Sequence, residues 1–435
     1  MIKRMALCII TTLLFSLPAQ ADKGANKPDD KGKGKDDDKT SMTCVQCHET
    51  ITPTIVTDWK LSAHSKEGVS CADCHGSEHT TEEDVDEAAV PMPEVCQECH
   101  GQQYEQFSNG KHALAWASFQ AMPTTHQLPA TLVEGMKGCG GCHKIGFKSE
   151  TDLEALKEAG QDYGVASCDN CHTRHLFSKE EAKQPQACRT CHMGFDHPQW
   201  EMYSSSKHGV RSDLKQLGVL PQEAGGPTCQ DCHLAGGNHE NRTPWGFLAV
   251  RLPLPEDEQW QADQVTILKA LGVINPETGL IDDAMAELVA TADVARLDQA
   301  AFDAERAKLL AVCSKCHSEK FAQAEMVKGD ETIREIDHLM AEAITIVARL
   351  YEEGLLRKPD GYLYDYPNLL TFHDAPTAIE QRLFVMHLEH RMRAFQGVFH
   401  ANPDYALWYG WSEMVRDLTA IKEMAVALGL NLDDE

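Results

Sequence analysis

The chain has 435 residues, among them 17 cysteines and 21 histidines, and its formal net charge is −27. This charge argues against nucleic-acid binding, because contacts to phosphates need a basic surface. It is compatible with a basic protein partner that is steered by long-range attraction, although solubility alone would also account for it.

The first 21 residues predict a secretory signal peptide. Lys3 and Arg4 supply the positive start, residues 7–17 are mostly apolar, and residues 19–21 fit an A-x-A cleavage site. The apolar run is shorter than the roughly 20 residues that span a bilayer. No later run is long enough either. We therefore expect signal cleavage, a periplasmic location and no membrane span.

Residues 22–43 are rich in Lys, Asp and Gly and have almost no apolar side chain. Such a segment has too little apolar surface to form a core, so the sequence predicts a disordered, charged linker. The first folded domain is then expected to begin at residue 44.

Eight CxxCH motifs account for 16 of the 17 cysteines, and the remaining one, Cys8, lies in the signal peptide. In each motif the two thiols can attach one haem, and the next histidine can bind its iron as the proximal ligand. We therefore predict eight covalently attached haem c groups. The attachment residues are Cys44, Cys47, Cys71, Cys74, Cys96, Cys99, Cys139, Cys142, Cys168, Cys171, Cys188, Cys191, Cys229, Cys232, Cys313 and Cys316. The proximal ligands are His48, His75, His100, His143, His172, His192, His233 and His317.

Other uses of paired cysteines fit this pattern poorly. A zinc ribbon needs two pairs per metal ion and no histidine after each pair. A disulfide framework would not repeat one pentapeptide, and redox CxxC sites occur singly. The predicted fold class is mainly α: residues 44–320 form an octahaem domain with little regular structure beyond short helices. Its haems would replace much of the usual apolar core.

Thirteen histidines lie outside the motifs, and some of them are expected to bind the irons from the opposite, distal side. An iron closed by a second histidine can only conduct electrons, whereas an open iron can bind a small molecule. Because there are more histidines than irons, counting leaves both possibilities open. The distal candidates are His64, His79, His112, His175, His208, His239 and His400.

After His317 the apolar residues recur at helical spacing. Three long helices are predicted over residues 331–356, about 376–400 and about 404–428, with Asp374 as a possible N-cap of the second. They form a predicted C-terminal helical domain, residues 321–435, that acts as a scaffold or oligomerisation arm. Aromatic residues gather at the start of the third helix, where we expect a packed interface: Tyr405, Trp408, Tyr409 and Trp411.

The segment from Cys168 to Gly209, with its CDNCHTRH and GFDH sequences, resembles the octahaem hydroxylamine oxidoreductase family. The order of the motifs and the helical tail are also similar, so the resemblance covers most of the mature chain. It implies that the fourth haem, on His143, is catalytic and that the other seven are carriers with two histidine ligands. It also implies a proton-handling pair, here Asp196 and His197, and a homotrimer.

One departure from the family concerns reaction direction. Oxidative members have a tyrosine, from the neighbouring subunit, that is covalently bonded to the catalytic haem; here the position falls on Trp408 or Leu407. Tyr405 and Tyr409 are close, but each requires a shift of the alignment. A second pocket tyrosine is also replaced, because Trp245 is followed by Phe247 and Leu248.

The chain thus resembles the reductive subgroup, which implies reduction of nitrite or hydroxylamine towards ammonia. The electrons would come from a cytochrome or a quinol-linked partner. Two alternatives stay open: oxidation of hydroxylamine to nitrite or nitric oxide, and a conduit in which all eight irons are closed. An octahaem nitrite reductase with a lysine-ligated haem is disfavoured, because no motif reads CxxCK.

Overall fold

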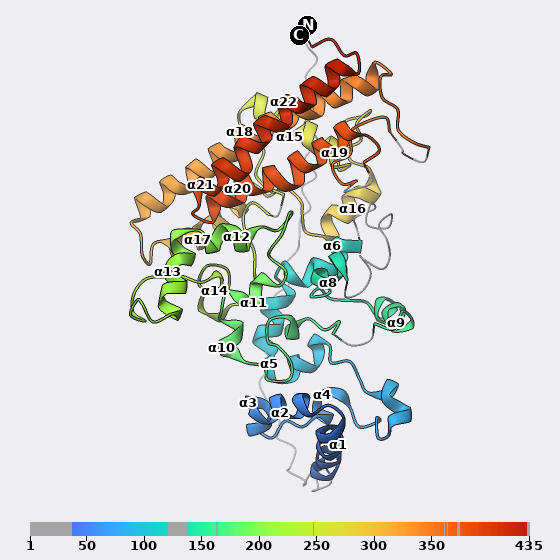
Figure 1. The fold of residues 1–435 in the computed structure, drawn as a ribbon, viewed down its shortest axis with the longest axis vertical. Coiled ribbons are helices and arrows are strands. Elements are labelled where there is room, and N and C mark those ends of the chain that lie inside the picture. The colour runs from blue at the N-terminus through green and yellow to red at the C-terminus, as the bar shows by residue number, and fades with distance from the viewer. Residues whose placement is uncertain are drawn as a thin grey trace, which may run out of the picture.

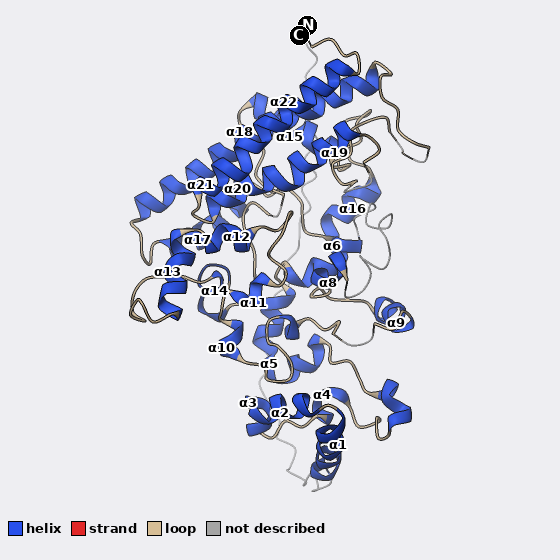
Figure 2. Ribbon diagram, viewed as in Figure 1, coloured by secondary structure: helices blue, strands red, loops and turns tan. Residues whose placement is uncertain are grey.

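The structure is a computed structural model that describes residues 37–120, 137–161, 164–246, 248–360, 362, 364–371 and 375–432. The predicted signal peptide lies outside this range, as do Phe247, Asp374 and two of the thirteen histidines outside the motifs, His126 and His373. Within it every regular element is a helix and no strand occurs, so the prediction of a mainly α fold is confirmed (Figure 2).

The part of the chain that carries the motifs is built mostly from short helices joined by loops. They are α1 (Asp37–Ile51), α2 (Pro53–Leu61), α3 (Ala63–Lys66), α4 (Ala72–His75), η1 (Glu82–Glu87), α5 (Pro93–Ser108), η2 (His112–Leu114), α6 (Ala115–Gln120), α8 (Gly138–His143), α9 (Glu150–Glu158), η4 (Cys168–Asn170), α10 (Lys179–Ala182), α11 (Gln186–Arg189), α12 (Gln199–Ser204), α13 (Lys207–Gln216), α14 (Cys229–His233), η5 (Ala235–Gly237), α15 (Glu258–Ala270), α16 (Asp283–Thr291) and α17 (Gln299–Cys313). Helix α1 starts inside the predicted linker, and α5, α15 and α17 are longer than the expected short helices.

Each motif covers about one helical turn, and the first and third lie inside the longer helices α1 and α5. In the four motifs that are not enclosed in one helix, the histidine N–H donates to the carbonyl of the first cysteine, for example His75 to Cys71 at 2.9 Å. Residues three and four apart lie on one face of such a turn, so both thiols and the imidazole face the same side. After His75, Gly76 takes a φ of 73°, which ends the turn.

Three helical stretches follow, as predicted, with different bounds. They are α18 (Glu319–Glu352); α19 (Ala378–Val385), the π-helical turn η7 (Met386–Arg391) and α20 (Met392–Phe399); and α21 (Pro403–Tyr405), the π-helical turn η8 (Ala406–Trp411) and α22 (Ser412–Ala427). Helix α18 begins twelve residues earlier than predicted, because the Ser318 hydroxyl accepts the Phe321 N–H and caps it. Thr377 caps α19.

The main apolar core lies along α18, which packs against α15, α20 and α22 (Figure 1). Ile333, Ile336, Met340 and Ile344 of α18 have no exposed surface. The core also takes in Trp245 and residues of α15 and α17, so it crosses the predicted boundary at residue 320. Helices α1–α4 lie at the opposite end of the molecule (Figure 1).

Asp337 of α18 joins these helices through polar contacts inside the core. It accepts hydrogen bonds from Arg391 at 2.7 Å and from Trp260 of α15 at 2.9 Å. Among the described residues, no helix combines the length and the apolar character needed to cross a bilayer.

Candidate haem-binding and catalytic site

A continuous cavity of about 3820 Å³ runs through the motif-bearing part of the molecule. Residues from all eight motifs line it, together with the seven distal candidates, Asp196 and His197. A pocket for one small organic ligand has a volume of about 300–1,000 Å³. The cavity is therefore of the size needed for a row of large cofactors.

Seven of the eight proximal histidines have one distal candidate facing them. The separations between ring centres are 6.0–6.3 Å. The pairs are His48 with His79, His75 with His175, His100 with His64, His172 with His239, His192 with His112, His233 with His400, and His317 with His208.

This spacing fits an iron between the two rings. An imidazole nitrogen binds a metal ion at about 2 Å, so two ligands on opposite faces of a haem have nitrogens about 4 Å apart and ring centres about 6 Å apart. Two imidazoles in direct contact would lie closer. The paired residues therefore fit haem with two histidine ligands.

Hydrogen bonds at Nδ1 orient several of these rings. The Nδ1–H groups of His75 and His143 donate to the carbonyls of Ala89 and Ala115, at 3.0 and 2.8 Å. Among the distal candidates, His79 donates to the Asp84 carboxylate at 2.9 Å and His400 to the Gln396 carbonyl at 2.7 Å. An occupied Nδ1 fixes the tautomer and leaves Nε2 available to bind iron.

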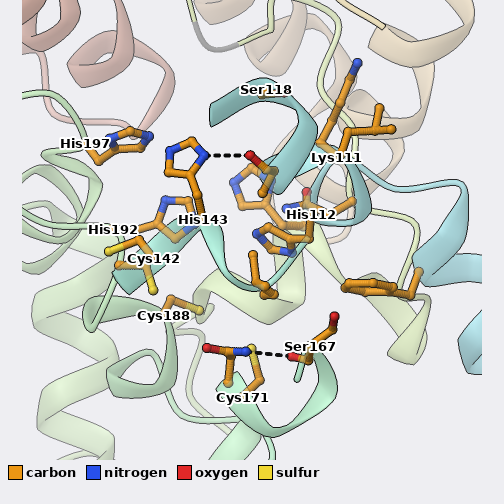
Figure 3. A pocket seen from close by; sticks show the side chains of 18 of the residues that line it. Lys111, His112, Ser118, Cys142, His143, Ser167, Cys171, Cys188, His192 and His197 are labelled. Atoms are coloured by element: carbon orange, nitrogen blue, oxygen red, sulfur yellow. Dashed lines mark hydrogen bonds between the residues drawn. The ribbon is translucent and has the colours of Figure 1, made fainter. Parts of the chain in front are cut away.

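His143 of the fourth motif is the proximal histidine that none of the seven distal candidates faces. Its ring lies beside Phe119, and a small apolar cluster with Trp116 packs nearby. Burial lowers the pKa of His143 below its ordinary value, which keeps the ring in the neutral form that binds metal ions. Figure 3 shows His143 donating to a backbone carbonyl, with His192 and His197 close by.

The ring of His197 stands edge-on to two proximal histidines. Its centre is 6.4 Å from His143 and 6.1 Å from His192. Asp196 is next to it, with an Nδ1–Oδ2 distance of 3.1 Å. Burial alone would raise the pKa of the Asp196 carboxyl, but the hydrogen bond and charge of His197 bring it below its ordinary value. The pair combines an ionised carboxylate with a histidine that it orients.

Cysteines of different motifs lie near enough to shift one another's pKa, and these neighbours give the order of the motifs in space. They link the first motif to the second, the second to the third, the third to the fifth, and then the fifth, sixth, seventh and eighth in a row. The fourth motif lies beside the sixth, through Cys142 and Cys191. Groups attached here would form one connected path with the fourth as a branch.

The sequence did not predict the residues that orient the histidine rings through hydrogen bonds. Gln199 accepts from His192 Nδ1 at 3.3 Å and donates to Gln396 Oε1 at 2.7 Å, which ties a motif to α20. Asp84 likewise orients His79. A Gln seven residues after a motif, or an Asp five residues after a distal histidine, gives no signal by itself, since only tertiary contacts bring the atoms together.

The region of the missing tyrosine lies at the surface of this chain. Leu407, Trp408 and Tyr409 are 42%, 61% and 58% exposed, whereas Trp411 packs against the core around α18 and the Tyr405 ring contacts that of Tyr409. The Trp245 indole instead donates to Asp330 at 3.1 Å and stacks on Phe399 inside the helical core.

Comparisons with known proteins agree with this arrangement. Residues 66–247 and 286–360 match the family described as "Seven times multi-haem cytochrome CxxCH", and residues 16–76 match "Cytochrome c554 and c-prime". The chain is 26% identical to a Kuenenia stuttgartiensis protein named "Probable nitrite reductase-hydroxylamine oxidoreductase fusion protein", over 88% of this chain and 51% of that protein. It thus spans about half the length of this curated relative.

Two solved structures share the fold. One is a "reducing HAO-like protein complex" of Kuenenia stuttgartiensis, with a TM-score of 0.64, 25% identity, and coverage of 90% of this chain and 86% of that one. The other, a "Hypothetical multiheme protein", has a TM-score of 0.61 at 19% identity and covers 89% and 95%.

These relatives confirm the predicted resemblance to hydroxylamine oxidoreductases, and the CxxCH motifs together with the family matches establish covalently attached haem c. We conclude that the chain belongs to the multihaem cytochrome family with repeated CxxCH motifs.

Proposed function

We propose that this chain is a periplasmic octahaem oxidoreductase that reduces nitrite or hydroxylamine towards ammonia at the iron held by His143. The other seven proximal histidines, each with its distal partner, would hold haems that only carry electrons. The observation that carries the proposal is this asymmetry: seven proximal histidines each have a distal candidate of their own, whereas the ring near His143, that of His197, stands edge-on to both His143 and His192 and pairs with Asp196.

When bound, the haem at His143 supplies an iron for the substrate nitrogen and the electrons for its reduction. The residues of the chain do the rest. His143 would hold the iron, and its ring is fixed by the Ala115 carbonyl. His197, oriented by Asp196, delivers protons to each substrate oxygen that leaves as water.

The proposed direction, reduction, rests on the residues at the start of the third C-terminal helical stretch. The resemblance places a crosslinking tyrosine at Leu407 or Trp408, and neither residue can form that bond. Tyr405 and Tyr409 contact each other at 4.9 Å between ring centres. Without a crosslink the fourth haem is an ordinary haem c, and we assign the chain to the reducing side, as a homotrimer served by a cytochrome or quinol-linked donor.

The first experiment tests for one open iron. Carbon monoxide added to the reduced protein is expected to change the spectrum of one haem in eight. His79→Ala is the positive control, because removing the second histidine of one pair opens one more iron. A wild-type protein without any response, while the His79 variant responds, would leave only the electron conduit.

The second experiment separates a proton donor from an iron ligand at position 197. His197→Gln is expected to lower the rate of nitrite or hydroxylamine reduction about 10²–10⁴-fold, with the carbon monoxide response unchanged. His338→Gln is a matched control, since His338 also contacts a carboxylate, Asp263, at 3.1 Å, but outside the cavity. A carbon monoxide response that appears only in the His197 variant would make His197 a ligand.

The third experiment decides direction. With artificial donors the protein should reduce nitrite or hydroxylamine faster than it oxidises hydroxylamine with artificial acceptors. Denaturing gels should show a monomer. Faster oxidation, together with a covalent trimer and a red-shifted fourth haem, would establish the oxidative alternative.

A further inference from the structure

Two segments that carry distal candidates lie side by side at one wall of the cavity. The Lys111 N–H donates to the Asn241 carbonyl at 2.9 Å, and the Arg242 Nε–H donates to the Asn109 carbonyl at 2.7 Å. Gly110 allows this approach, because a Cβ there would lie 3.0 Å from the Asn241 nitrogen. His112 and His239 are thereby fixed close to a pair of cationic side chains.

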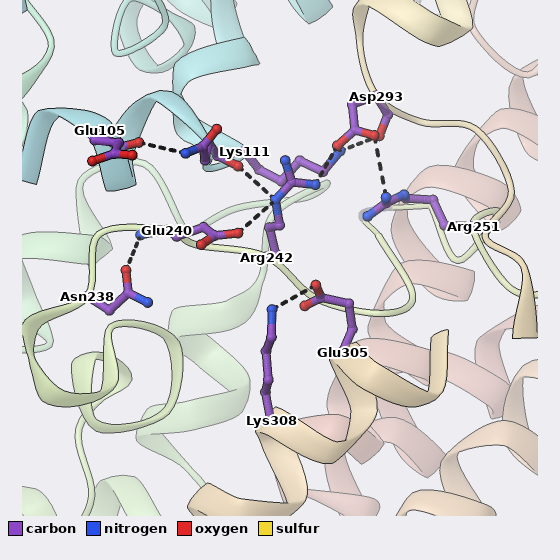
Figure 4. Close-up of polar contacts among 10 residues, drawn as sticks. Glu105, Lys111, Asn238, Glu240, Arg242, Arg251, Asp293, Glu305 and Lys308 are labelled. Atoms are coloured by element: carbon purple, nitrogen blue, oxygen red, sulfur yellow. Dashed lines mark hydrogen bonds and ion pairs between the residues drawn. The ribbon is translucent and has the colours of Figure 1, made fainter. Parts of the chain in front are cut away.

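Three cations converge on one carboxylate at this place (Figure 4). Asp293 lies 2.6 Å from Lys111 Nζ, 2.8 Å from Arg242 Nη1 and 3.5 Å from Arg251 Nη2. Of the other acids nearby, Glu240 contacts Arg242 at 3.4 Å, and Glu305 pairs with Lys308. Two carboxylates, Asp293 and Glu240, face three cations, which leaves one positive charge in excess around Asp293.

Arg251 lacks the partners that a buried cation needs. The residue is 4% exposed, and its Nε and Nη1 have no hydrogen-bond acceptor among the described residues. Gly246 packs against its side chain so closely that a Cβ there would lie 2.9 Å from Cδ. Its one ion pair, with Asp293 at 3.5 Å, leaves two N–H groups of a buried guanidinium without an acceptor, which is costly, so the structure implies a further acceptor that binds there.

We propose that Lys111, Arg242 and Arg251 form an anion-binding site whose ligand is a planar group with two oxygens and one negative charge. All three line the cavity that holds the motif residues. The planar guanidinium matches such a group, and its free N–H donors would take the oxygens. Two sources share this chemistry: a propionate carboxylate of a haem bound nearby, and nitrite, the substrate in the proposed function.

The two sources make different predictions for Arg251→Gln. If the ligand is a haem propionate, loss of the positive charge favours the oxidised iron, so the midpoint potential of one haem shifts to lower values. If the ligand is nitrite, the KM for nitrite rises, whereas that for hydroxylamine, which is neutral, does not change. The propionate source rests only on family membership, and the nitrite source rests on the proposed function.

The experiment is a spectroelectrochemical titration of the fully loaded protein without substrate, followed by steady-state kinetics. Arg251→Gln and the partly exposed Arg242→Gln should act in the same direction, the second more weakly, and Arg251→Lys should restore part of the effect. Arg334→Gln, an exposed arginine on α18, is the control for net charge.

A lowered potential with an unchanged nitrite KM assigns the site to a propionate, a raised nitrite KM alone assigns it to nitrite, and both effects together support the anion site with both ligands. Unchanged potentials and KM values in the variants at 251 and 242, with full haem content, would overturn the proposal. If Arg251→Gln fails to fold, Arg242→Gln decides in the same way. The titration needs no turnover, so it tests this site even in a protein without activity. An inactive wild type would contradict the proposed function and would leave the test of the anion site unaffected.

Discussion

The motif-bearing part of the chain and the helices packed around α18 are stabilised in different ways. Along α18, side chains such as Ile336 and Met340 are completely buried and form a continuous apolar core. In the motif-bearing part the 16 cysteines of the motifs are exposed or half-buried, and 14 of them line a cavity of about 3820 Å³. The polypeptide alone thus fills one part of the molecule and leaves the other hollow.

The difference shows what the haems contribute besides chemistry. A chain that surrounds a large cavity lacks the apolar contacts that stabilise the interior of an ordinary domain. Haem is large and mostly apolar, so its attachment can replace those contacts. The core around α18 is filled by side chains alone. It contacts the motif-bearing part through hydrogen bonds such as that between Gln199 and Gln396.

The largest expected effect comes from preventing haem attachment. In a host without cytochrome c maturation, residues 44–240 should lose their fold and become sensitive to protease. Helix α18 and its partners should stay protected, because their core contains no haem. Limited proteolysis with mass spectrometry reads both regions at once. Equal protection of residues 44–240 with and without haem would contradict the comparison.

Asp337→Ala should produce the next largest effect. It removes the acceptor for Arg391 and Trp260 and leaves a fully buried guanidinium unpaired. Loss of one partner of a buried ion pair costs about 3–5 kcal/mol. Denaturant unfolding followed by circular dichroism measures this cost. The control is Glu342→Ala, which breaks the exposed pair with Lys422 at 2.5 Å and should cost no more than about 1 kcal/mol.

A smaller change tests how tightly the core around α18 is packed. Ile344→Val deletes one methylene at a site without exposed surface and should lower the free energy of unfolding by about 0.5–1.5 kcal/mol, with unchanged haem spectra. On the same helix Val327 is 50% exposed, so Val327→Ala should stay within about 0.5 kcal/mol of wild type. Equal effects would mean that α18 is not tightly packed.

The smallest expected effect is an acid dependence at Asp293. Burial by itself would raise the pKa of its carboxyl. The hydrogen bond from Lys111 and the neighbouring cations have the larger, opposite effect, so the pKa lies below its ordinary value of 3.8. A carboxyl with a lowered pKa in the folded state stabilises the fold at higher pH, and this contribution is lost as the pH falls through that lowered value.

Below about pH 4 the free energy of unfolding of the wild type should therefore fall more steeply than that of Asp293→Asn, which has no carboxyl at this position. Unfolding curves of the two proteins at neutral pH and in acid give the comparison. A stability difference that is the same at both pH values would show that the carboxylate makes no net contribution through its charge.

The C-terminal helices could be predicted because their pattern is local. Ile333, Ile336 and Met340 recur at helical spacing in the predicted range 331–356, and all three are buried on one face of α18. The start of α18 could not be read in this way. Residues 319–330 have a weaker apolar pattern, and the Ser318 cap and contacts such as Gly329 against Phe399 decide that they are helical.

The sequence by itself predicts where haems attach and which histidines bind iron as proximal ligands, because a CxxCH motif holds all three groups on one helical turn. Only the tertiary structure decided which distal candidate faces which motif. His79 is four residues from His75 yet faces His48, and His175 is three residues from His172 yet faces His75. The reason is geometric: a short turn presents its side chains to one side, so the opposite face of each haem must be reached by a segment from elsewhere in the chain.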